Sequence, residues 1–296
     1  MLFEKLKERF PGIRQKEPLK NHCTFRVGGP ADLFYELTNI EEIPELIAFT
    51  EENSIPYRII GRGTNVLFTD KGFRGLIIKN LSNEYRVDGE EISANSGALL
   101  SQIIRLSIDN NLSGLEPLYG LPGTIGGAVW GNAGIPGTEI KQFVKKVVLF
   151  NASDGVREMN ADEISFQYRK TSLQDAQNII MHVVLRLQKG HQKASKELMK
   201  KIDEIRRGKQ PIGYTAGSFF KNPSPEKPAG WLIDQAGLKG TRIGDAEISA
   251  KHANFFMNTG HATALQIFEL AELAKTKVKE KFSIDLEMEV KIIGDL

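Results

Sequence analysis

The sequence predicts an α+β fold divided into more than one domain. Three observations predict it: short apolar runs typical of strands, amphipathic stretches typical of helices, and a polar break between two blocks of such segments. The chain has 296 residues, of which 41% are hydrophobic and 26% are charged. This is the composition of an ordinary globular protein, and the length leaves room for two domains.

The first part of the chain alternates between helical and extended patterns. Apolar residues recur at helical spacing after Ile40, whereas continuous apolar runs end at glycine or polar residues. Asp88-Gly89 is a pair typical of a tight hairpin turn. In chain order we expect a short helix and connector over residues 1–20, a strand interrupted by a turn over Thr24–Glu36, a helix over Ile40–Asn53, strands over Tyr57–Ile60 and Gly75–Lys79, a hairpin over Glu84–Asn95 and a helix over Ser101–Asn111.

The later part of the chain begins with strands and ends with a well-marked helix. Thr263 and Gln266 predict a capping box. The apolar residues that follow at helical spacing are Ile267, Leu270, Ala271, Ala274 and Val278. The other elements that we expect are strands over Lys145–Phe150 and Asn178–Leu187, a basic helix over Glu197–Arg207 and a strand over Leu286–Ile293.

Charge and cysteine content exclude several classes of protein. The formal net charge is +2, so bulk charge argues neither for nor against a nucleic-acid partner. Cys23 is the single cysteine, which excludes an intrachain disulfide and a cysteine-based metal cluster. We expect no metal site. No stretch is apolar enough to span a bilayer, and the first ten residues lack an apolar signal core, so we expect a cytoplasmic protein.

Two glycine-rich segments are the strongest functional signal. The first is Gly61–Asn65, which follows an apolar run; the second is Gly114–Gly137, which holds eight glycines in 24 residues. Without a Cβ, glycine lets backbone N–H groups approach a ligand closely, and consecutive N–H groups bind phosphate. Two such segments suit a dinucleotide whose phosphates are held from two sides. The alternative is a long crossing loop that is rich in glycine because it packs tightly.

Neither segment matches a common nucleotide-binding fingerprint. Val66 stands where the third glycine of the dinucleotide fingerprint would lie, and the residues after it break the helix that the fingerprint requires. A phosphate-binding loop of the GxxxxGK[ST] type is also absent from the sequence. A Rossmann fold is therefore not expected.

Long motifs resemble a known flavoenzyme family. GRGTNVL and GLEPLYGLPGTIGGAVWGNAG resemble the FAD-binding domain of the vanillyl-alcohol oxidase and p-cresol methylhydroxylase type, and more closely the UDP-N-acetylenolpyruvoylglucosamine reductase family. The resemblance runs from Thr24 to Gly294. It implies an FAD-binding domain of two α/β lobes and a smaller C-terminal α+β domain for the substrate. The short path after Leu238 resembles the shorter family members, which lack a tyrosine-bearing insertion.

The resemblance implies a reaction and its cofactors. Members of the family bind FAD non-covalently and use NADPH to reduce the enolpyruvyl group of UDP-N-acetylglucosamine-enolpyruvate to UDP-N-acetylmuramate, in a ping-pong reaction of peptidoglycan precursor synthesis. We therefore expect a UDP-sugar as the substrate, neither nucleic acid nor membrane as a partner, and a monomer.

Three further motifs carry the family's catalytic residues. They are Tyr168-Arg169-Lys170-Thr171-Ser172, Ala216-Gly217-Ser218-Phe219-Phe220-Lys221-Asn222-Pro223 and Leu286-Glu287-Met288-Glu289-Val290-Lys291. By this match Arg169, Ser218 and Glu289 are the expected catalytic residues. Hydride addition to C3 of the enol ether builds negative charge, which the Arg169 guanidinium would stabilise. Ser218 would protonate C2, and Glu289 would orient a donor or, if protonated, donate a hydrogen bond itself.

The resemblance also implies binding residues and domain limits. Arg62 stands where glycine is common in the family, so that it would contact phosphate or point to solvent. The expected substrate contacts are Tyr168, Lys221 and Asn222. The expected FAD contacts are Gly61, Arg62, Gly63, Thr64, Asn65, Gly120, Pro122, Gly123, Thr124, Gly126, Gly127, Ala128, Asn132 and Gly134. The expected domains are 1–22 (helix and connector), 23–190 (FAD-binding, with lobes of about 23–80 and 81–190) and 191–296 (substrate-binding), with the boundary in the polar Gln188–Lys196 segment.

Two other interpretations stay open. A flavoenzyme of the same fold, such as an alcohol or sugar-acid oxidase, would commonly tether FAD through His or Cys. A nucleotide- or nucleic-acid-binding module would use the basic 196–209 segment, would be colourless, and would bind less tightly as salt increases.

Overall fold

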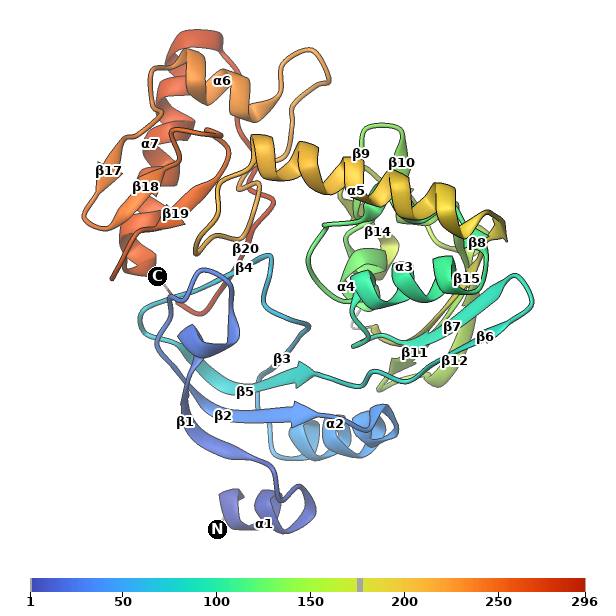
Figure 1. The fold of residues 1–296 in the computed structure, drawn as a ribbon. Coiled ribbons are helices and arrows are strands. Elements are labelled where there is room, and N and C mark those ends of the chain that lie inside the picture. Colours follow the sequence, from blue (N-terminus) through green and yellow to red (C-terminus); the bar gives the residue numbers. More distant parts are fainter. Residues whose placement is uncertain (1, 175–177, 296) are drawn as a thin grey trace. The chain divides into compact units, whose positions relative to one another are not determined.

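The computed structural model describes residues 2–174 and 178–295 (Figure 1). The chain forms two compact units, and each is assembled from three separate stretches of sequence. Unit 1 consists of residues 1–13, 35–62 and 77–206, and unit 2 consists of residues 14–34, 63–76 and 207–296. Strands β2 (Pro30–Leu37) and β5 (Phe73–Asn80) contribute residues to both units and lie in a sheet of order β1-β2-β5-β3. The domain limits expected from the sequence stay a prediction.

Unit 1 is built around an antiparallel sheet of order β12-β11-β15-β7-β6. Helices α3 and α4 pack against β7, and α4 also packs against β15 (Figure 1). The strands of this sheet are β6 (Tyr85–Asp88), β7 (Glu91–Asn95), β11 (Val144–Asn151), β12 (Gly155–Asn160) and β15 (Ile179–Arg186). The helices of the unit are α1 (Leu2–Arg9), α2 (Ile43–Glu52), α3 (Leu100–Asp109), α4 (Ile125–Trp130) and α5 (Gln192–Lys209), the last of which ends in unit 2.

Short strands and 3₁₀ turns complete unit 1. The strands are β3 (Tyr57–Ile60), β8 (Leu112–Ser113), β9 (Gly134–Ile135), β10 (Thr138–Glu139), β13 (Phe166–Gln167), β14 (Lys170–Thr171) and β16 (Gln188–Lys189). The 3₁₀ turns are Ile40–Glu42, Glu116–Leu118, Ile140–Gln142, Ala161–Glu163 and Ser172–Gln174.

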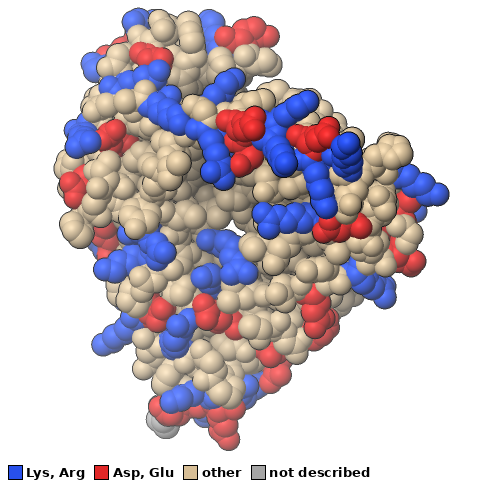
Figure 2. Space-filling model, in the orientation of Figure 1, with Lys and Arg blue, Asp and Glu red and all other residues tan. Residues whose placement is uncertain are grey.

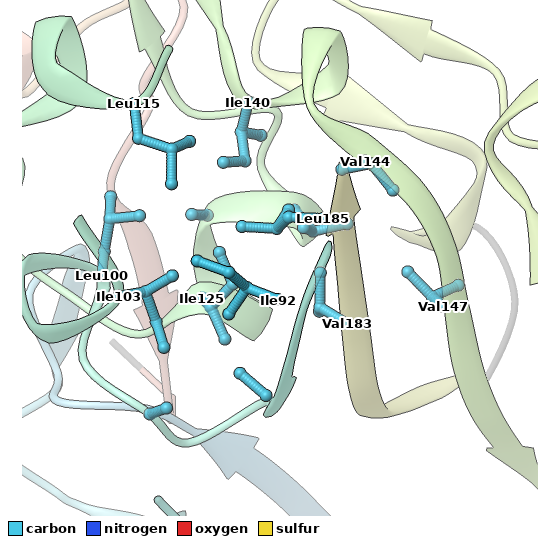
Figure 3. Close-up of a cluster of buried hydrophobic side chains, with 14 of the residues drawn as sticks. Ile92, Leu100, Ile103, Leu115, Ile125, Ile140, Val144, Val147, Val183 and Leu185 are labelled. Carbon is cyan, nitrogen blue, oxygen red and sulfur yellow. The ribbon is translucent and has the colours of Figure 1, made fainter. Parts of the chain in front are cut away.

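The core of unit 1 fixes where the glycine-rich segment lies. Figure 3 shows Ile125, at the start of α4, among Ile92 of β7 and Ile103 of α3, with Val183 and Leu185 of β15 close by. All five side chains are buried. The apolar side chains of β7, β15 and α3 therefore fix the position of α4, the short helix within the glycine-rich segment.

Unit 2 is built around helix α7 (Ala264–Phe282), which packs on α6 (Ala229–Gln235) and on the sheet β17-β18-β19. The capping box of Thr263 and Gln266 is present, and the five predicted apolar residues of α7 are all buried, so both predictions are confirmed. The side chain of Asp70 accepts hydrogen bonds from the first two N–H groups of this helix. The remaining elements are β1 (Arg14–Pro18), β4 (Val66–Phe68), β17 (Arg242–Ile243), β18 (Ala246–Ile248), β19 (Phe256–Asn258), β20 (Lys291–Ile293) and the 3₁₀ turn Leu19–His22.

Several expected elements are corrected by the structure. The strand in the Thr24–Glu36 segment begins only at Pro30, because Thr24 and Phe25 lie in a turn and residues 26–29 have no regular secondary structure. Helix α5 begins at Gln192 rather than Glu197, so the segment that we expected to be a polar break is partly helical. The final strand covers only Lys291–Ile293, because the chain before it pairs with the Phe219–Lys221 segment through an isolated bridge, Phe220–Met288, and not through a continuous ladder.

The surface carries charges of both signs. Figure 2 shows Lys and Arg side chains interspersed with Asp and Glu over α5 on the face drawn. Among the described residues, none of the helices combines the length and the apolar character that crossing a bilayer requires.

Candidate active site

The two glycine-rich segments expected to bind a dinucleotide meet within unit 1. A methyl group added at Gly61 would lie 2.8 Å from Thr124 Oγ1 and 2.9 Å from Thr124 Cγ2. Thr124 caps α4, because its Oγ1 accepts a hydrogen bond from Gly127 N (3.2 Å). Gly61 is thus glycine because the second loop passes directly against it. The sequence predicted two segments acting together, and the structure brings them into contact.

Some of the glycines are required by packing inside the protein. The N–H groups of Ile125 and Gly126, at the start of α4, donate to Ala98 O (2.8 Å) and Ser96 O (2.9 Å). A methyl group at Gly126 would lie 2.5 Å from Ser96 Cβ. In unit 2, a methyl group at Gly63 would lie 2.1 Å from His22 O. For these positions, the alternative interpretation of a tightly packed crossing loop describes what the structure shows.

Two guanidinium groups lie at the glycine-rich loops of unit 1. Arg62 follows Gly61, and its Nε is a buried atom without a hydrogen-bond partner within the described part of the chain. Arg206 packs on the second loop: a methyl group at Gly120 would lie 2.6 Å from its Nε. Burial lowers the pKa of Arg206, although an arginine stays charged at neutral pH. A buried guanidinium donor that finds no acceptor among the described residues fits the diphosphate of a dinucleotide.

Arg169 occupies a constrained position in unit 1. Its backbone is left-handed, with φ +56°, and its guanidinium donates to Gly134 O (2.7 Å) and Asn132 O (3.5 Å). The guanidinium also lies 5.0 Å from the centre of the Tyr168 ring, which is exposed. The structure therefore brings together Arg169 and two residues, Asn132 and Gly134, that were expected to contact FAD.

Ser218 and Glu289 lie on paired segments of unit 2. Glu289 N donates to Phe219 O (2.8 Å), and Phe219 N donates to Asn254 O (2.8 Å). Ser218 itself forms an isolated antiparallel bridge with Phe255. The Ser218 segment is thus flanked by the Glu289 segment and by the Asn254 segment. Of the three expected catalytic residues, Arg169 therefore belongs to unit 1, whereas Ser218 and Glu289 belong to unit 2.

Asn254 was missed as a residue that builds this site. Its amide bonds both polar groups of the Phe220 backbone: Oδ1 accepts from Phe220 N (2.9 Å), and Nδ2 donates to Phe220 O (2.8 Å). Asn254 N in turn donates to His252 Nδ1 (3.2 Å), and burial lowers the pKa of His252. In the sequence, the signal for Asn254 was its place two residues after His252 in AKHANFFMN. That signal could not reveal the contact with Phe220, which lies 34 residues away.

Other expected site residues make contacts within unit 2. Asn65 Nδ2 donates to Glu289 O (3.2 Å), so this expected FAD residue holds the segment of an expected catalytic residue. Lys221 Nζ pairs with Glu287 Oε1 (2.6 Å), and Asn222 Oδ1 accepts from Ala229 N (3.0 Å) at the start of α6. The ligand contacts expected of these residues stay predictions.

Comparison with known proteins identifies the two parts of the chain. Residues 31–159 match the family model described as an FAD binding domain. Residues 210–293 match the model described as the C-terminal domain of UDP-N-acetylenolpyruvoylglucosamine reductase. The expected α+β fold, with an FAD-binding domain followed by a smaller C-terminal domain, is confirmed.

Relatives match over almost the whole chain. A UDP-N-acetylenolpyruvoylglucosamine reductase of Caldanaerobacter subterraneus is 39% identical over all of this chain and 99% of its own length. One of Clostridium novyi is 39% identical over 96% of this chain and 92% of its own. The crystal structure of the reductase from Thermus caldophilus superposes with a TM-score of 0.82 at 34% identity, covering 95% of this chain and all of that one. The chain therefore belongs to the UDP-N-acetylenolpyruvoylglucosamine reductase family.

Proposed function

We propose that this protein reduces the enolpyruvyl group of UDP-N-acetylglucosamine-enolpyruvate to UDP-N-acetylmuramate, with FAD as its cofactor and NADPH as the hydride donor. The single observation that carries this function is the 39% identity to a reductase of that name over the whole chain. As a member of this family, the protein is an FAD-dependent oxidoreductase of peptidoglycan precursor synthesis. We further propose that it is of the shorter kind, without the tyrosine-bearing insertion.

The residues present fit FAD. When bound, FAD carries the hydride from NADPH to the substrate in two successive half-reactions. The orphaned Nε of Arg62 and the contact between Gly61 and Thr124 support a diphosphate site at the two loops. The residues that would hold the cofactor there are Gly61, Arg62, Gly63, Thr64, Asn65, Gly120, Pro122, Gly123, Thr124, Gly126, Gly127, Ala128 and Gly134. Asn132, which the sequence also indicated as an FAD contact, uses both polar atoms of its side chain within the protein.

Three side chains would act on the substrate itself. Arg169 would stabilise the negative charge that develops beside the substrate carboxylate when C3 receives the hydride, because its planar fork of donors matches a carboxylate. Ser218 would deliver the proton to C2. Glu289 would orient a donor toward the same charge or, if protonated, donate a hydrogen bond to it directly. Tyr168, Lys221 and Asn222 would contact the UDP part, whose diphosphate requires cationic or amide donors.

We also propose the finer organisation of the protein. Residues 23–190 would bind FAD, residues 191–296 would bind the substrate, and residues 1–22 would form a helix and connector. The protein would act as a cytoplasmic monomer, with neither nucleic acid nor membrane as a partner. The single cysteine, Cys23, supports a reducing compartment because it allows no intrachain disulfide.

The proposed reaction is tested in its two halves. The purified protein should be yellow, NADPH should bleach the flavin without oxygen, and the enolpyruvyl UDP-sugar should restore the colour. A flavin that stays attached after denaturation would instead favour a covalent oxidase of the same fold. A colourless protein whose binding weakens steeply with salt would favour the nucleic-acid module.

Ser218→Ala is expected to separate the two half-reactions. Removing the proton donor should slow the return of colour about 100- to 10,000-fold and leave bleaching by NADPH nearly unchanged. Ser153→Ala, in the exposed turn between β11 and β12, is the matched control and should alter neither half. Equal losses in both halves for Ser218→Ala would contradict the role of this serine as proton donor.

A further inference from the structure

Two segments that are far apart in the sequence of unit 1 are joined by a set of side-chain hydrogen bonds. Trp130 O accepts from Thr171 Oγ1 (2.9 Å) and from Gln174 Nε2 (2.7 Å). Asn132 Nδ2 donates to Gln167 O (3.0 Å). The Arg169 guanidinium closes the set by donating to Gly134 O and Asn132 O. We call these two segments, 130–134 and 167–174, the arginine clamp.

Arg169 depends on the arginine clamp for its conformation. With φ +56°, it occupies a left-handed backbone region that residues other than glycine rarely adopt, and only surrounding contacts can maintain it there. The clamp supplies those contacts. Asn132 Nδ2 bonds the backbone two residues before Arg169, at Gln167 O, and Gly134 O accepts from the Arg169 guanidinium. The two carbonyls, Gly134 O and Asn132 O, therefore fix the direction in which the guanidinium points.

Asn132 is the centre of the arginine clamp. The residue is fully buried, and its own backbone is left-handed at φ +43°, which asparagine tolerates better than most residues. Both polar atoms of its side chain are used within the protein, since Nδ2 donates to Gln167 O and Oδ1 accepts from Lys141 N (3.4 Å). Its carbonyl accepts from Arg169. The same residue thus contacts the Arg169 segment through its side chain and through its backbone.

We propose that Asn132 is a positioning residue for Arg169: it sets the direction of the guanidinium that stabilises the developing negative charge. The proposal rests on the proposed function. Displacing a catalytic group by about 1 Å can slow a reaction about 100-fold even when the changed residue does not touch the substrate. Asn132 therefore matters for the half-reaction that uses Arg169, and not for hydride transfer from NADPH.

The test is Asn132→Gly, compared with Gln174→Ala. Glycine accepts the left-handed backbone and removes only the side chain, while Gln174→Ala removes another bond of the arginine clamp that does not touch Arg169. For Asn132→Gly we expect the return of colour with the enolpyruvyl substrate to slow about 30- to 100-fold, with flavin content and bleaching by NADPH within about twofold of wild type. For Gln174→Ala, the rates of both half-reactions should stay within about threefold of wild type. Asn132→Asp, which keeps the left-handed preference but loses the donor to Gln167 O, should behave like Asn132→Gly and replaces it if the glycine variant does not fold.

A double-mutant cycle with Arg169→Lys identifies the route of the effect. If Asn132 acts through Arg169, the double variant should restore the colour less than about threefold more slowly than Arg169→Lys alone. Equilibrium binding of UDP-N-acetylmuramate, measured by titration, should weaken in each single variant and not further in the double variant. Full additivity, or an Asn132→Gly effect no larger than that of Gln174→Ala, would overturn the proposal. Loss of flavin from Asn132→Gly would also overturn it and would place Asn132 among the cofactor contacts. A wild-type protein that fails either half-reaction would instead contradict the proposed function.

Discussion

The candidate catalytic residues of the two units are held by different kinds of bonds. In unit 1, Arg169 lies in the arginine clamp, where side chains such as Asn132 bond the backbone of a distant segment. In unit 2, Ser218 and Glu289 lie on segments joined mainly through backbone N–H and C=O groups. Backbone bonds can be made by almost any residue, whereas a side-chain bond requires one residue type. Unit 1 should therefore be the more sensitive to single substitutions near its candidate site.

Gly61→Ala tests the sensitivity of unit 1 and should have the largest effect on stability. The added methyl group would lie within 3 Å of two atoms of Thr124, and threonine has little rotamer freedom to move away. We expect a loss of up to about 3 kcal/mol in the free energy of unfolding and a lower ratio of flavin to protein. Gly208→Ala is the matched control, because a methyl group there meets no atom within 4 Å. Unchanged stability and flavin content in Gly61→Ala would show that the loops separate at little cost.

Asn254→Ala tests an exception in unit 2, where a side chain supports the backbone pairing. Removing the amide leaves the N–H and C=O groups of Phe220 buried without partners, which should cost about 2 kcal/mol in the free energy of unfolding. Urea denaturation measures this cost. Asn83→Ala, at an exposed position before β6, is the control and should change the free energy of unfolding by less than about 0.5 kcal/mol. If both variants lose the same small amount, the backbone ladder alone holds the Ser218 segment.

The smallest expected effect is a pH dependence that comes from His252. Burial lowers its pKa below the ordinary value of 6.5, so the unfolded chain takes up this proton before the folded chain does as the pH falls. The contribution of His252 to stability is therefore complete above about pH 6.5 and decreases as the pH falls below it. Protonation would also remove the acceptor for Asn254 N. The free energy of unfolding should differ less between pH 8 and pH 5.5 for His252→Gln than for wild type. His261→Gln, at an exposed position, should retain the wild-type difference.

Much of the fold could be predicted because local patterns dominate in the elements concerned. Strand β3 has the limits that its apolar run predicts, and α2, α3, α7 and the β6–β7 hairpin lie within a few residues of expectation. The misses have physical causes. Strand β1 is polar, because pairing with β2 and not an apolar face defines it. Helix α4 is short and contains two glycines, so its sequence looks like a loop; burial of Ile125 and Val129 stabilises it.

The candidate site could be predicted less completely, because its contacts join distant parts of the chain. The sequence indicated the two glycine-rich segments and the charged residues near them, and the contact between Gly61 and Thr124 agrees with segments that act together. It could not indicate that Gly126 is a glycine because of Ser96, or that Asn254 bonds Phe220. Such roles depend on which backbone groups tertiary packing brings within reach, and no local pattern encodes that.

The discontinuous make-up of unit 2 limits when it can be completed in the cell. Its parallel pair joins β4 with β20, so Val66–Phe68 leave the ribosome long before Lys291–Ile293 are translated. Until then, the edge of β4 has no partner strand and is open to pairing with another nascent chain. Closure of unit 2 is therefore a late event in biosynthesis, and chaperone binding during translation would act on this exposed edge.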